Sequence, residues 1–519
     1  MVTQTAAPTA FGALETSQSL SPEQIEARAK ELLAQLTLDE KTNLMSADPP
    51  FWPGLGDMFN GGYNAHIWPA GATPRLGIPG IRFSDGPRGI VMKGATTFPV
   101  SMARGAAWDV DLEERIGDVI GRELRALGGN FFGGVCINLL RHPAWGRAQE
   151  TYGEDTHLLG EMGAALARGV QRHVMACAKH YALNSMENAR FKVDVTIDER
   201  ALHEVYLPHF KRTVEAGVAS IMSAYNSVNG EWAGQNLHLL TEILREQWGF
   251  QGFVMTDFVW GLRDPVASVA AGQDLEMPFR QQRARVLPAA LRDGRLRRED
   301  ARRAAVRLVG AQIQLALRAE PTPGVDVVAS SEHRALAREA AVLGSVLLRN
   351  DGVLPIGPQT TVALLGPLAD VPALGDLGSS RVHPPDAVTI RQGLQERLVR
   401  AWSPTLRMPT SPLSWSGCES SSRPDTQERC PETCTMSSVR RVPEKIRTID
   451  SRPANGSVVV RITWATSGAS GSESGCGSTS PSVVVSDGFG CRPGVGKPCS
   501  ISASNSSMPT PVPVCTGTT

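Results

Sequence analysis

Polar side chains that can bind and cleave small molecules follow a series of short apolar runs in this sequence. They are mainly carboxylates, cations and a hydroxyl, and each run is long enough to be one strand. Functional groups of a parallel α/β barrel stand at the carboxyl ends of its strands, so we expect these side chains to meet there. In chain order they are Asp85 after IPGIRF, Arg141 and Arg147 after CINLL, Lys179 and His180 after MACA, Tyr225 after IMSA, Asp257 after GFVM, and Asp274 and Glu276 in GQDLEMP.

Each of these residues, taken alone, has an ordinary structural explanation. A strand-end aspartate often caps the next helix, a lone histidine is often a satisfied core group, and an arginine often only holds a loop. The whole set is harder to explain in this way, because burying many ionisable groups together costs several kcal/mol unless they pair or bind a ligand. Carboxylates flanked by cationic and hydroxyl groups suit a polyhydroxylated ligand, whose hydroxyls need both donors and acceptors.

The sequence lacks the motifs of several other common enzyme classes. The sequence has no GxxxxGK(S/T) loop, no strand-linked GxGxxG and no GxSxG elbow, which argues against nucleotide and esterase chemistry. A metal-dependent barrel hydrolase is the main rival enzyme class. His142 and His180 stand alone, without HxH or HExxH spacing, so we predict neither a metal nor a cofactor at this site.

The elements expected to position these residues are alternating strands and helices from about residue 78 to 318. The apolar runs lack polar alternation, which is typical of strands buried on both faces of a parallel sheet. In one intervening helix, Asp109 is the expected cap, Leu112, Ile116, Ile120 and Leu124 recur at helical spacing, and Gly128 is the expected end. We predict an α/β fold with a (β/α)8 TIM-like barrel, and a doubly wound open sheet is the structural alternative.

The chain divides by composition into four predicted segments. Residues 1–20 are an N-terminal tail, and 21–320 are the barrel, whose first helix begins at the capping box formed by Ser21 and Gln24. Residues 330–400 begin a truncated α/β sandwich domain, in which SEHRALAREAAVLGSVLLRNDGVLPI indicates a helix, a strand and a turn, followed by the strand TVALLGP.

Residues 401–519 differ sharply from the rest of the chain. They hold seven of the nine Cys, 24 Ser and only two Leu, too little apolar surface to offset chain entropy. One interpretation is a disordered extension, and a Cys-rich secreted module is another. We favour a third, an aberrant stretch translated out of frame, because the change falls partway through a regular α/β pattern.

Charge and hydropathy limit location and partners. Lys plus Arg and Asp plus Glu both total 52, which leaves no excess of basic charge for nucleic acid or an anionic membrane. No signal-peptide pattern opens the chain and no 18-residue apolar run spans a bilayer, so we expect a cytoplasmic location. Cys136 and Cys177 lie in apolar runs and are expected to be free thiols. The oligomeric state is not predicted.

Five ordered motifs resemble the barrel domain of glycoside hydrolase family 3. The similar stretches are PRLGIPGIRFSDGPRGI, NLLRHPAWGRAQETYGEDTHLLGEM, ACAKHYALN, SIMSAYNSVNG and GFVMTDFVWG. The likeness continues through GSVLLRNDGVLPI and GDLGSSRVHPPDAVTIRQGL and covers about residues 35 to 398. This resemblance implies retaining hydrolysis of terminal non-reducing β-D-glycosidic bonds, as in a β-glucosidase. The substrate would be a β-linked oligosaccharide or an aryl or alkyl glycoside.

Site residues follow from the matched positions. Asp257 would be the nucleophile that forms a covalent glycosyl-enzyme, and its neighbouring cations are expected to lower its pKa. Asp85 would accept hydrogen bonds from sugar hydroxyls, which strengthen in the transition state. The other residues implied for binding the first sugar are Arg147, Lys179, His180 and Tyr225, with Arg141, Met222, Trp260 and Glu276 as lesser candidates.

Two positions depart from the family pattern. Phe258 follows the nucleophile where the family usually has Trp, and Trp260 comes two residues later. The general acid/base of β-glucosidase-type members is a Glu in the sandwich domain, and the corresponding stretch here lies beyond residue 400, without a matching motif. KHYALNSMENARF also lacks the second His of the N-acetylglucosaminidase branch. A sugar-binding homologue without its acid/base is therefore the alternative function, and a metal-dependent barrel hydrolase is a third.

Overall fold

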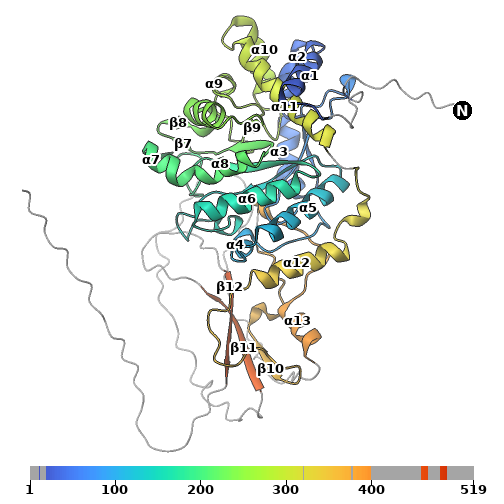
Figure 1. Cartoon of the computed structure of the whole chain (residues 1–519), viewed down its shortest axis with the longest axis vertical. Helices are drawn as coiled ribbons and strands as arrows, with labels where there is room; N and C mark the ends of the chain where they lie inside the picture. Colours follow the sequence, from blue (N-terminus) through green and yellow to red (C-terminus); the bar gives the residue numbers. More distant parts are fainter. Residues whose placement is uncertain are drawn as a thin grey trace, which may run out of the picture. The chain divides into compact units, whose positions relative to one another are not determined.

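A computed structural model of the chain describes residue 11, residues 19–318, 321–375 and 378–398, and the backbone of residues 457–465 and 480–487. The chain forms two compact units (Figure 1). The first comprises Met1–Asp351, Pro367–Leu394 and Thr463–Ser482, and the second comprises Gly352–Gly366, Gln395–Ile462 and Val483–Thr519. Most of the predicted N-terminal tail and most of the predicted aberrant tail lie outside the described residues.

A six-stranded sheet forms the centre of the first unit. Its spatial order is β1-β2-β3-β4-β6-β9, and every neighbouring pair after β2 is parallel. The strands are β1 (Trp68–Ala70), β2 (Ile81–Ser84), β3 (Phe131–Cys136), β4 (Met175–Tyr181), β6 (Ser220–Ser223) and β9 (Phe253–Met255).

Single bridges close this sheet into a ring. Met255 in β9 bridges Leu275, the next residue Glu276 bridges Ser46, and Ala47 bridges Ala70 in β1. Backbone hydrogen bonds support the closure, among them Leu275 N to Val254 O at 3.0 Å and Ala47 N to Glu276 O at 2.9 Å. Six strands and two short extended segments thus form a curled, closed sheet of the expected barrel type. The open doubly wound sheet, which was the structural alternative, does not form.

One strand of the ring runs against the expected direction. β1 pairs with β2 in antiparallel fashion, with Trp68 opposite Phe83. Only residues 71–80 connect the two strands, whereas a parallel crossover needs about a dozen residues or more. The prediction of eight parallel strands is therefore wrong for β1.

Successive residues of the parallel strands point into two different apolar cores. Phe131, Cys177 and Phe253 pack in one cluster inside the ring, whereas their neighbours Phe132, Ala178 and Val254 pack in a second cluster outside it. Because both faces are buried, these strands carry no polar alternation, as the sequence predicts.

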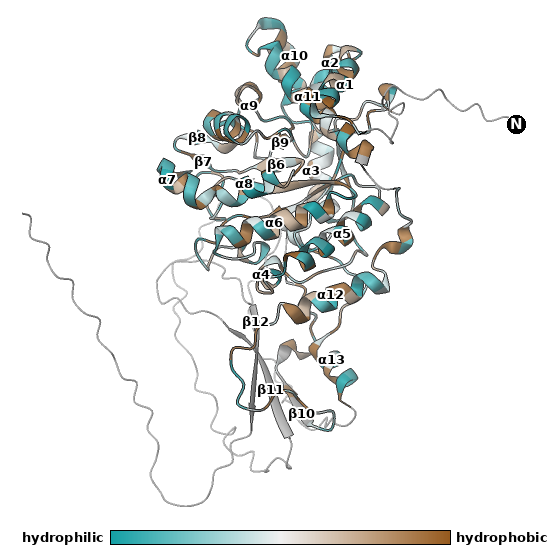
Figure 2. Cartoon of the chain, in the orientation of Figure 1, coloured by the Kyte–Doolittle hydropathy of each residue, from teal (hydrophilic) through white to brown (hydrophobic). Residues whose placement is uncertain are grey.

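The helices cover the outside of the ring. Figure 1 shows α5, α6 and α8 side by side along the sheet, and Figure 2 shows that α5 and α6 carry both hydrophilic and hydrophobic residues. The predicted caps are confirmed: the Asp109 side chain accepts a hydrogen bond from Leu112 N in α5, and Ser21 and Gln24 form the capping box of α1. The α-helices are α1 (Pro22–Ala34), α2 (Leu38–Leu44), α3 (Phe51–Phe59), α4 (Ser101–Gly105), α5 (Val110–Ala126), α6 (Thr156–Val170), α7 (Glu199–Ala201), α8 (Pro208–Glu215), α9 (Pro265–Ala271), α10 (Arg283–Asp293), α11 (Arg298–Arg318), α12 (Ser331–Leu343) and α13 (Ile390–Arg397).

A small sheet extends the carboxyl edge of the ring. It has the order β5-β7-β8, with β5 parallel to β7 and β7 antiparallel to β8. Its strands are β5 (Asp194–Val195), β7 (Ser227–Val228) and β8 (Glu231–Trp232). Two π-helical segments, η4 (Leu202–Tyr206) and η6 (His238–Gln247), precede α8 and β9.

The segment from residue 331 matches its prediction only in part. The expected helix is α12, and the expected strand TVALLGP contains β10 (Thr361–Leu365). The strand expected in GSVLLRN does not form: residues 345–350 have no regular structure, and Leu348 is 92% exposed. A strand needs neighbouring strands for its backbone groups, and none of the strand pairings among the described residues involves residues 345–350.

Two further strands lie within residues 401–519. They are β11 (Ser457–Ala465) and β12 (Ser480–Asp487), and β10 pairs with β11 in parallel. Both contain a run of three valines, which favours strand structure. The described backbone therefore includes strands in a segment for which the sequence predicts no regular structure.

Among the described residues, no helix is long and apolar enough to cross a membrane.

Candidate active site

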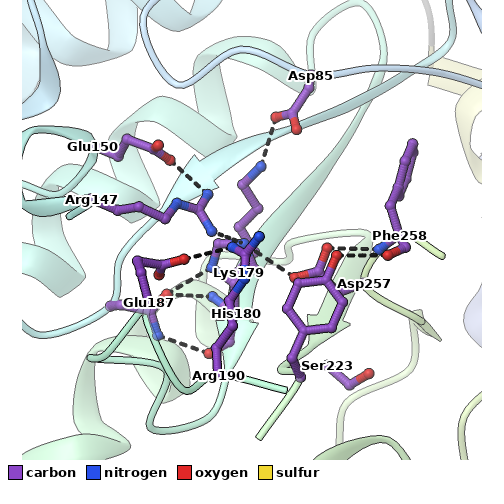
Figure 3. Close-up of polar contacts among 12 residues, drawn as sticks. Asp85, Arg147, Glu150, Lys179, His180, Glu187, Arg190, Ser223, Asp257 and Phe258 are labelled. Atoms are coloured by element: carbon purple, nitrogen blue, oxygen red, sulfur yellow. Dashed lines mark hydrogen bonds and ion pairs between the residues drawn. The ribbon is translucent and has the colours of Figure 1, made fainter. Parts of the chain in front are cut away.

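Five of the predicted polar residues gather at the carboxyl ends of the ring strands. Asp85 follows β2, Lys179 and His180 lie near the end of β4, Tyr225 follows β6, and Asp257 follows β9. All five side chains are buried, with at most 7% of each residue exposed. Figure 3 shows Asp85, Lys179, His180 and Asp257 within one group of polar contacts.

Asp85 and Lys179 form a buried ion pair. The Lys179 ammonium lies 2.6 Å from Asp85 Oδ1, and the Tyr63 hydroxyl donates to Asp85 Oδ2 at 2.6 Å. Burial opposes the charge of Lys179, but the Asp85 carboxylate outweighs it and raises the pKa of Lys179 above its ordinary value. The pair therefore presents a fixed negative acceptor beside a fixed positive donor.

A second buried ion pair joins Arg147 to Glu150. One guanidinium nitrogen donates to Glu150 Oε2 at 2.7 Å, and another lies 3.0 Å from His180 Nε2. Burial favours the neutral acid, yet the charge of Arg147 outweighs it and lowers the pKa of Glu150. Glu150 thus remains an ionised partner that holds Arg147 in place.

His180 is neutral in this environment. Burial, followed by the charges of Arg147 and Lys179, lowers its pKa well below the ordinary value. Its Nε2 faces a guanidinium donor and its Nδ1 lies 2.9 Å from Asn138 Oδ1, so the proton belongs on Nδ1. The 3.6 Å approach of Nε2 to Asp257 Oδ2 is consequently no ion pair, because the imidazole carries no charge.

Asp257 is buried with one oxygen unengaged. Its Oδ1 accepts from Phe258 N at 2.7 Å, whereas no described residue donates a hydrogen bond to Oδ2. Burial raises the pKa of Asp257 above its ordinary value, although Arg147, Arg190 and Lys179 oppose this shift. The expectation of a lowered pKa is therefore wrong, because removal of the carboxylate from water outweighs the nearby cations.

A tight, strained turn presents Asp257. A Cβ on Gly261 would lie 2.4 Å from the Asp257 carbonyl oxygen, so only glycine fits there. Val259 has a φ of 66°, an unusual value for a β-branched residue. Hydrogen bonds from Val259 N to Met277 O and from Gln281 Nε2 to Val259 O fix this conformation. Backbone strain held in this way is typical of functional sites.

Tyr225 lies beside Asp257 within an aromatic group. Its hydroxyl donates to Phe258 O at 2.6 Å, and burial followed by the Asp257 charge raises the pKa of Tyr225 well above its ordinary value. The Phe191 ring lies 4.7 Å from the Tyr225 ring and 5.5 Å from that of Trp260. Trp260 is half-exposed, so it forms the solvent side of this group.

Four predicted residues have different surroundings. Asp274 is fully buried and lies 2.8 Å from Arg245 and 3.1 Å from Arg307, so it is the partner of those two cations. Met222 is buried in the inner core of the ring, opposite Lys179 in the strand register. Arg141 is exposed, and no hydrogen bond or ion pair among the described residues joins it to the group. Glu276 is fully buried and accepts from Ser46 Oγ, Gln282 N and Arg283 N, so it fixes the start of α10 and makes no contact with the group.

Several members of the group were not among the predicted residues. Arg190 donates to Glu187 at 2.6 Å, and its guanidinium lies 4.9 Å from the centres of the Phe191 and Tyr225 rings. Asn138 interrupts an apolar run and Glu150 follows Arg147 by three residues, two signals that could have revealed them. Tyr63, Glu187 and Arg190 lie outside the strand ends, where no periodic pattern marks them. The unpredicted residues are Tyr63, Asn138, Glu150, Glu187 and Arg190.

Residues 65–311 match the model of the glycosyl hydrolase family 3 N-terminal domain, and this range includes every candidate active-site residue named above except Tyr63. Residues 65–311 are therefore a glycosyl hydrolase family 3 N-terminal domain. The resemblance noted from the five motifs is therefore confirmed.

Named relatives agree with this family. A β-glucosidase from Rhizobium radiobacter is 34% identical over 384 residues, which cover 72% of this chain and 45% of that protein. Thermostable β-glucosidase B from Acetivibrio thermocellus is 35% identical over 373 residues, covering 68% of this chain and 46% of that protein. The chain thus spans less than half the length of these two relatives.

Solved structures of β-glucosidases are also similar to this chain over part of their length. β-Glucosidase 3B from Thermotoga neapolitana, in complex with glucose, matches with a TM-score of 0.64 and 33% identity over 72% of this chain and 55% of that one. DesR, a β-glucosidase from Streptomyces venezuelae in complex with D-glucose, matches with a TM-score of 0.65 and 34% identity, over 71% of this chain and 48% of that one.

Proposed function

We propose that this chain carries the sugar-binding and nucleophilic half of a retaining β-glycosidase, with β-D-glucosides as substrates. Asp257 Oδ2 attacks the anomeric carbon of the terminal sugar, and the bond to the departing oxygen breaks as the new carbon–oxygen bond forms. Water then hydrolyses the covalent glycosyl-enzyme. The glucose-bound β-glucosidases among the similar structures support the choice of sugar.

The observation that carries the proposal is the unengaged Asp257 Oδ2 among fixed donors and acceptors. Every other carboxylate of the group is bound to a cation: Asp85 to Lys179, Glu150 to Arg147 and Glu187 to Arg190. Asp257 has no such pairing: no described residue donates a hydrogen bond to its Oδ2, and Arg147, Arg190 and Lys179 oppose the rise in pKa that its burial causes. A nucleophile needs such a free, ionised oxygen.

The remaining side chains suit recognition of sugar hydroxyls. Asp85 supplies acceptor oxygens, Lys179 and Arg147 supply donors, and the aromatic faces near Tyr225 supply apolar surface for the ring. Positions held by two or three internal bonds lose little entropy on binding, so these groups act as a preorganised site. We do not assign Arg141 or Glu276 to it.

One observation favours the alternative of a sugar-binding protein without full activity. A general acid needs a raised pKa, but Arg147 lowers the pKa of Glu150, and Asp85 and Glu187 are held in ion pairs. The family's acid/base would fall beyond residue 400, outside the described side chains. The chain is therefore expected to need a substrate whose leaving group departs without protonation.

Substrates with different leaving groups test the proposal. With 2,4-dinitrophenyl β-D-glucoside, whose phenolate leaves unprotonated, we expect a rapid burst of about one equivalent of phenolate per chain. The variant Asp257→Asn should give no burst, whereas Asp351→Asn, at an exposed carboxylate, should behave as wild type. Rapid-mixing absorbance measures both, and intact-protein mass identifies the glycosylated chain.

The outcomes separate the candidate functions. Steady turnover of a methyl or alkyl glucoside as well would indicate a complete hydrolase with its own acid. A burst equal in Asp257→Asn and wild type would reject Asp257 as the nucleophile. Glucose binding without any burst would favour the sugar-binding alternative, and activity lost to a chelator and restored by Zn²⁺ would favour the metal-dependent hydrolase.

A further inference from the structure

Glu199, His203 and His238, none of which belongs to the candidate active site, converge on one another at the protein surface. Glu199 lies in α7, His203 in the adjoining η4, and His238 at the start of η6. Glu199 Oε2 lies 3.5 Å from His203 Nε2 and 3.2 Å from His238 Nε2. One ligating atom of each residue falls within 4.8 Å of the other two.

Buried contacts hold the two elements that carry these residues. Leu202, beside His203, and Leu239, beside His238, are both fully buried in the outer core. The Asp198 side chain accepts from Ala201 N to begin α7, and Asn236 Oδ1 accepts from Leu239 N at the start of η6. The helix ends are thus positioned before any ligand binds.

The spacing suits a late transition metal. Two imidazole nitrogens and one carboxylate oxygen are a usual ligand set for Zn²⁺. Bonds of about 2.0–2.1 Å to a tetrahedral Zn²⁺ place its ligands roughly 3.3 Å apart, close to the two distances above. His203 follows Glu199 by four residues, so one turn supplies both ligands and η6 supplies the third.

A fourth residue orients one ligand. Glu242 Oε2 lies 2.6 Å from Nδ1 of His238, one turn earlier in η6. A proton on Nδ1 then points to Glu242, which leaves the Nε2 lone pair facing Glu199 and His203. A carboxylate behind a histidine ligand is the usual second partner at zinc sites, where it fixes the tautomer.

We propose that Glu199, His203 and His238 bind one divalent late-transition cation, with Zn²⁺ the best match and Glu242 as the positioning residue. The bound ion links α7 and η4 to η6, and water completes its coordination. This site has three protein ligands from two surface elements, so we assign it to stabilisation of the fold rather than to the glycosidase reaction. A cation that binds only the folded chain raises its melting temperature.

The test is calorimetric titration of the full, metal-free chain with Zn²⁺. Iodoacetamide first blocks accessible thiols, because cysteines elsewhere in the chain also bind this ion. We expect one equivalent to bind in wild type and to be lost in His203→Ala and in His238→Ala. Glu242→Gln should retain that equivalent with a dissociation constant raised about 10-fold or more.

A matched control separates this site from ordinary surface histidines. His66 is exposed and paired to Asp57, but the described residues place no second histidine beside it. His66→Ala should therefore bind Zn²⁺ as wild type does and show the same rise in melting temperature. Equal stoichiometry and equal thermal shifts in wild type, His203→Ala and His238→Ala would overturn the proposal. If either alanine variant fails to fold, Glu199→Gln, at an exposed carboxylate, gives the same decision.

Discussion

Two apolar runs of similar length differ in secondary structure and in burial. Phe253, Val254 and Met255 form β9 and are fully buried, whereas Val346, Leu347 and Leu348 form no strand and are 62%, 63% and 92% exposed. β9 pairs with β6, and Met255 also bridges Leu275 on its other side, so its backbone groups are satisfied on both edges. An apolar run therefore forms a strand here only where neighbouring strands can hydrogen-bond to its backbone.

Ion pairs in the two regions should also differ in how much they stabilise the fold. Lys179→Met leaves the buried Asp85 carboxylate without its cation, and we expect a loss of about 3–5 kcal/mol in the free energy of unfolding. Arg349→Met removes one partner of the exposed pair with Asp351 and should cause no measurable change. Urea unfolding followed by far-UV circular dichroism measures both, and equal losses would show that the two pairs share one environment.

The second prediction compares the same substitution in both regions. Leu275 is fully buried where the ring closes. Leu275→Ala should therefore lower the free energy of unfolding by about 2–5 kcal/mol, because apolar burial is lost and a cavity remains. Leu348→Ala, at a 92% exposed side chain, should stay within about 0.5 kcal/mol of wild type. A large loss for Leu348→Ala in the same urea experiment would mean that the 346–348 run is covered in solution.

The third prediction concerns the buried carboxylate of the candidate nucleophile. Because burial raises the pKa of Asp257, the folded chain binds a proton more readily than the unfolded chain, and this group destabilises the fold above its folded pKa. Asp257→Asn should therefore raise the melting temperature at pH 7, by a few degrees at most. The gain should shrink as the pH falls toward the ordinary value of 3.8.

An exposed carboxylate provides the control for this titration. Asp351→Asn, at an aspartate 68% exposed in its side chain, should leave the melting temperature unchanged at both pH values. A lower melting temperature for Asp257→Asn at pH 7 would contradict the inference that desolvation outweighs the surrounding cations.

Sequence reasoning succeeded where regular periodicity fixes position. Asp85, Lys179, His180, Tyr225 and Asp257 each follow a buried strand, and parallel strands bring their carboxyl ends to one edge. Local signals such as the Asp109 cap were also readable, because capping depends on a few adjacent residues.

Other features depend on quantities that the sequence does not contain. Tyr63 and Arg190 reach the group from irregular segments, so no period places them. The pKa of Asp257 depends on the balance between burial and nearby charges. The sequence shows the charges but not the depth of burial, which makes the shift upward. The composition of residues 346–348 predicts a strand, but strand pairing depends on segments that are distant in the sequence.

The closure of the ring has a consequence for how the chain folds during synthesis. Ser46 and Glu276, which meet at the seam, are 230 residues apart. At about 5–20 residues per second, a ribosome needs ten seconds or more to add that much chain. Until then the Ser46 side of the seam has no partner, and an open strand edge of this kind invites pairing with other chains.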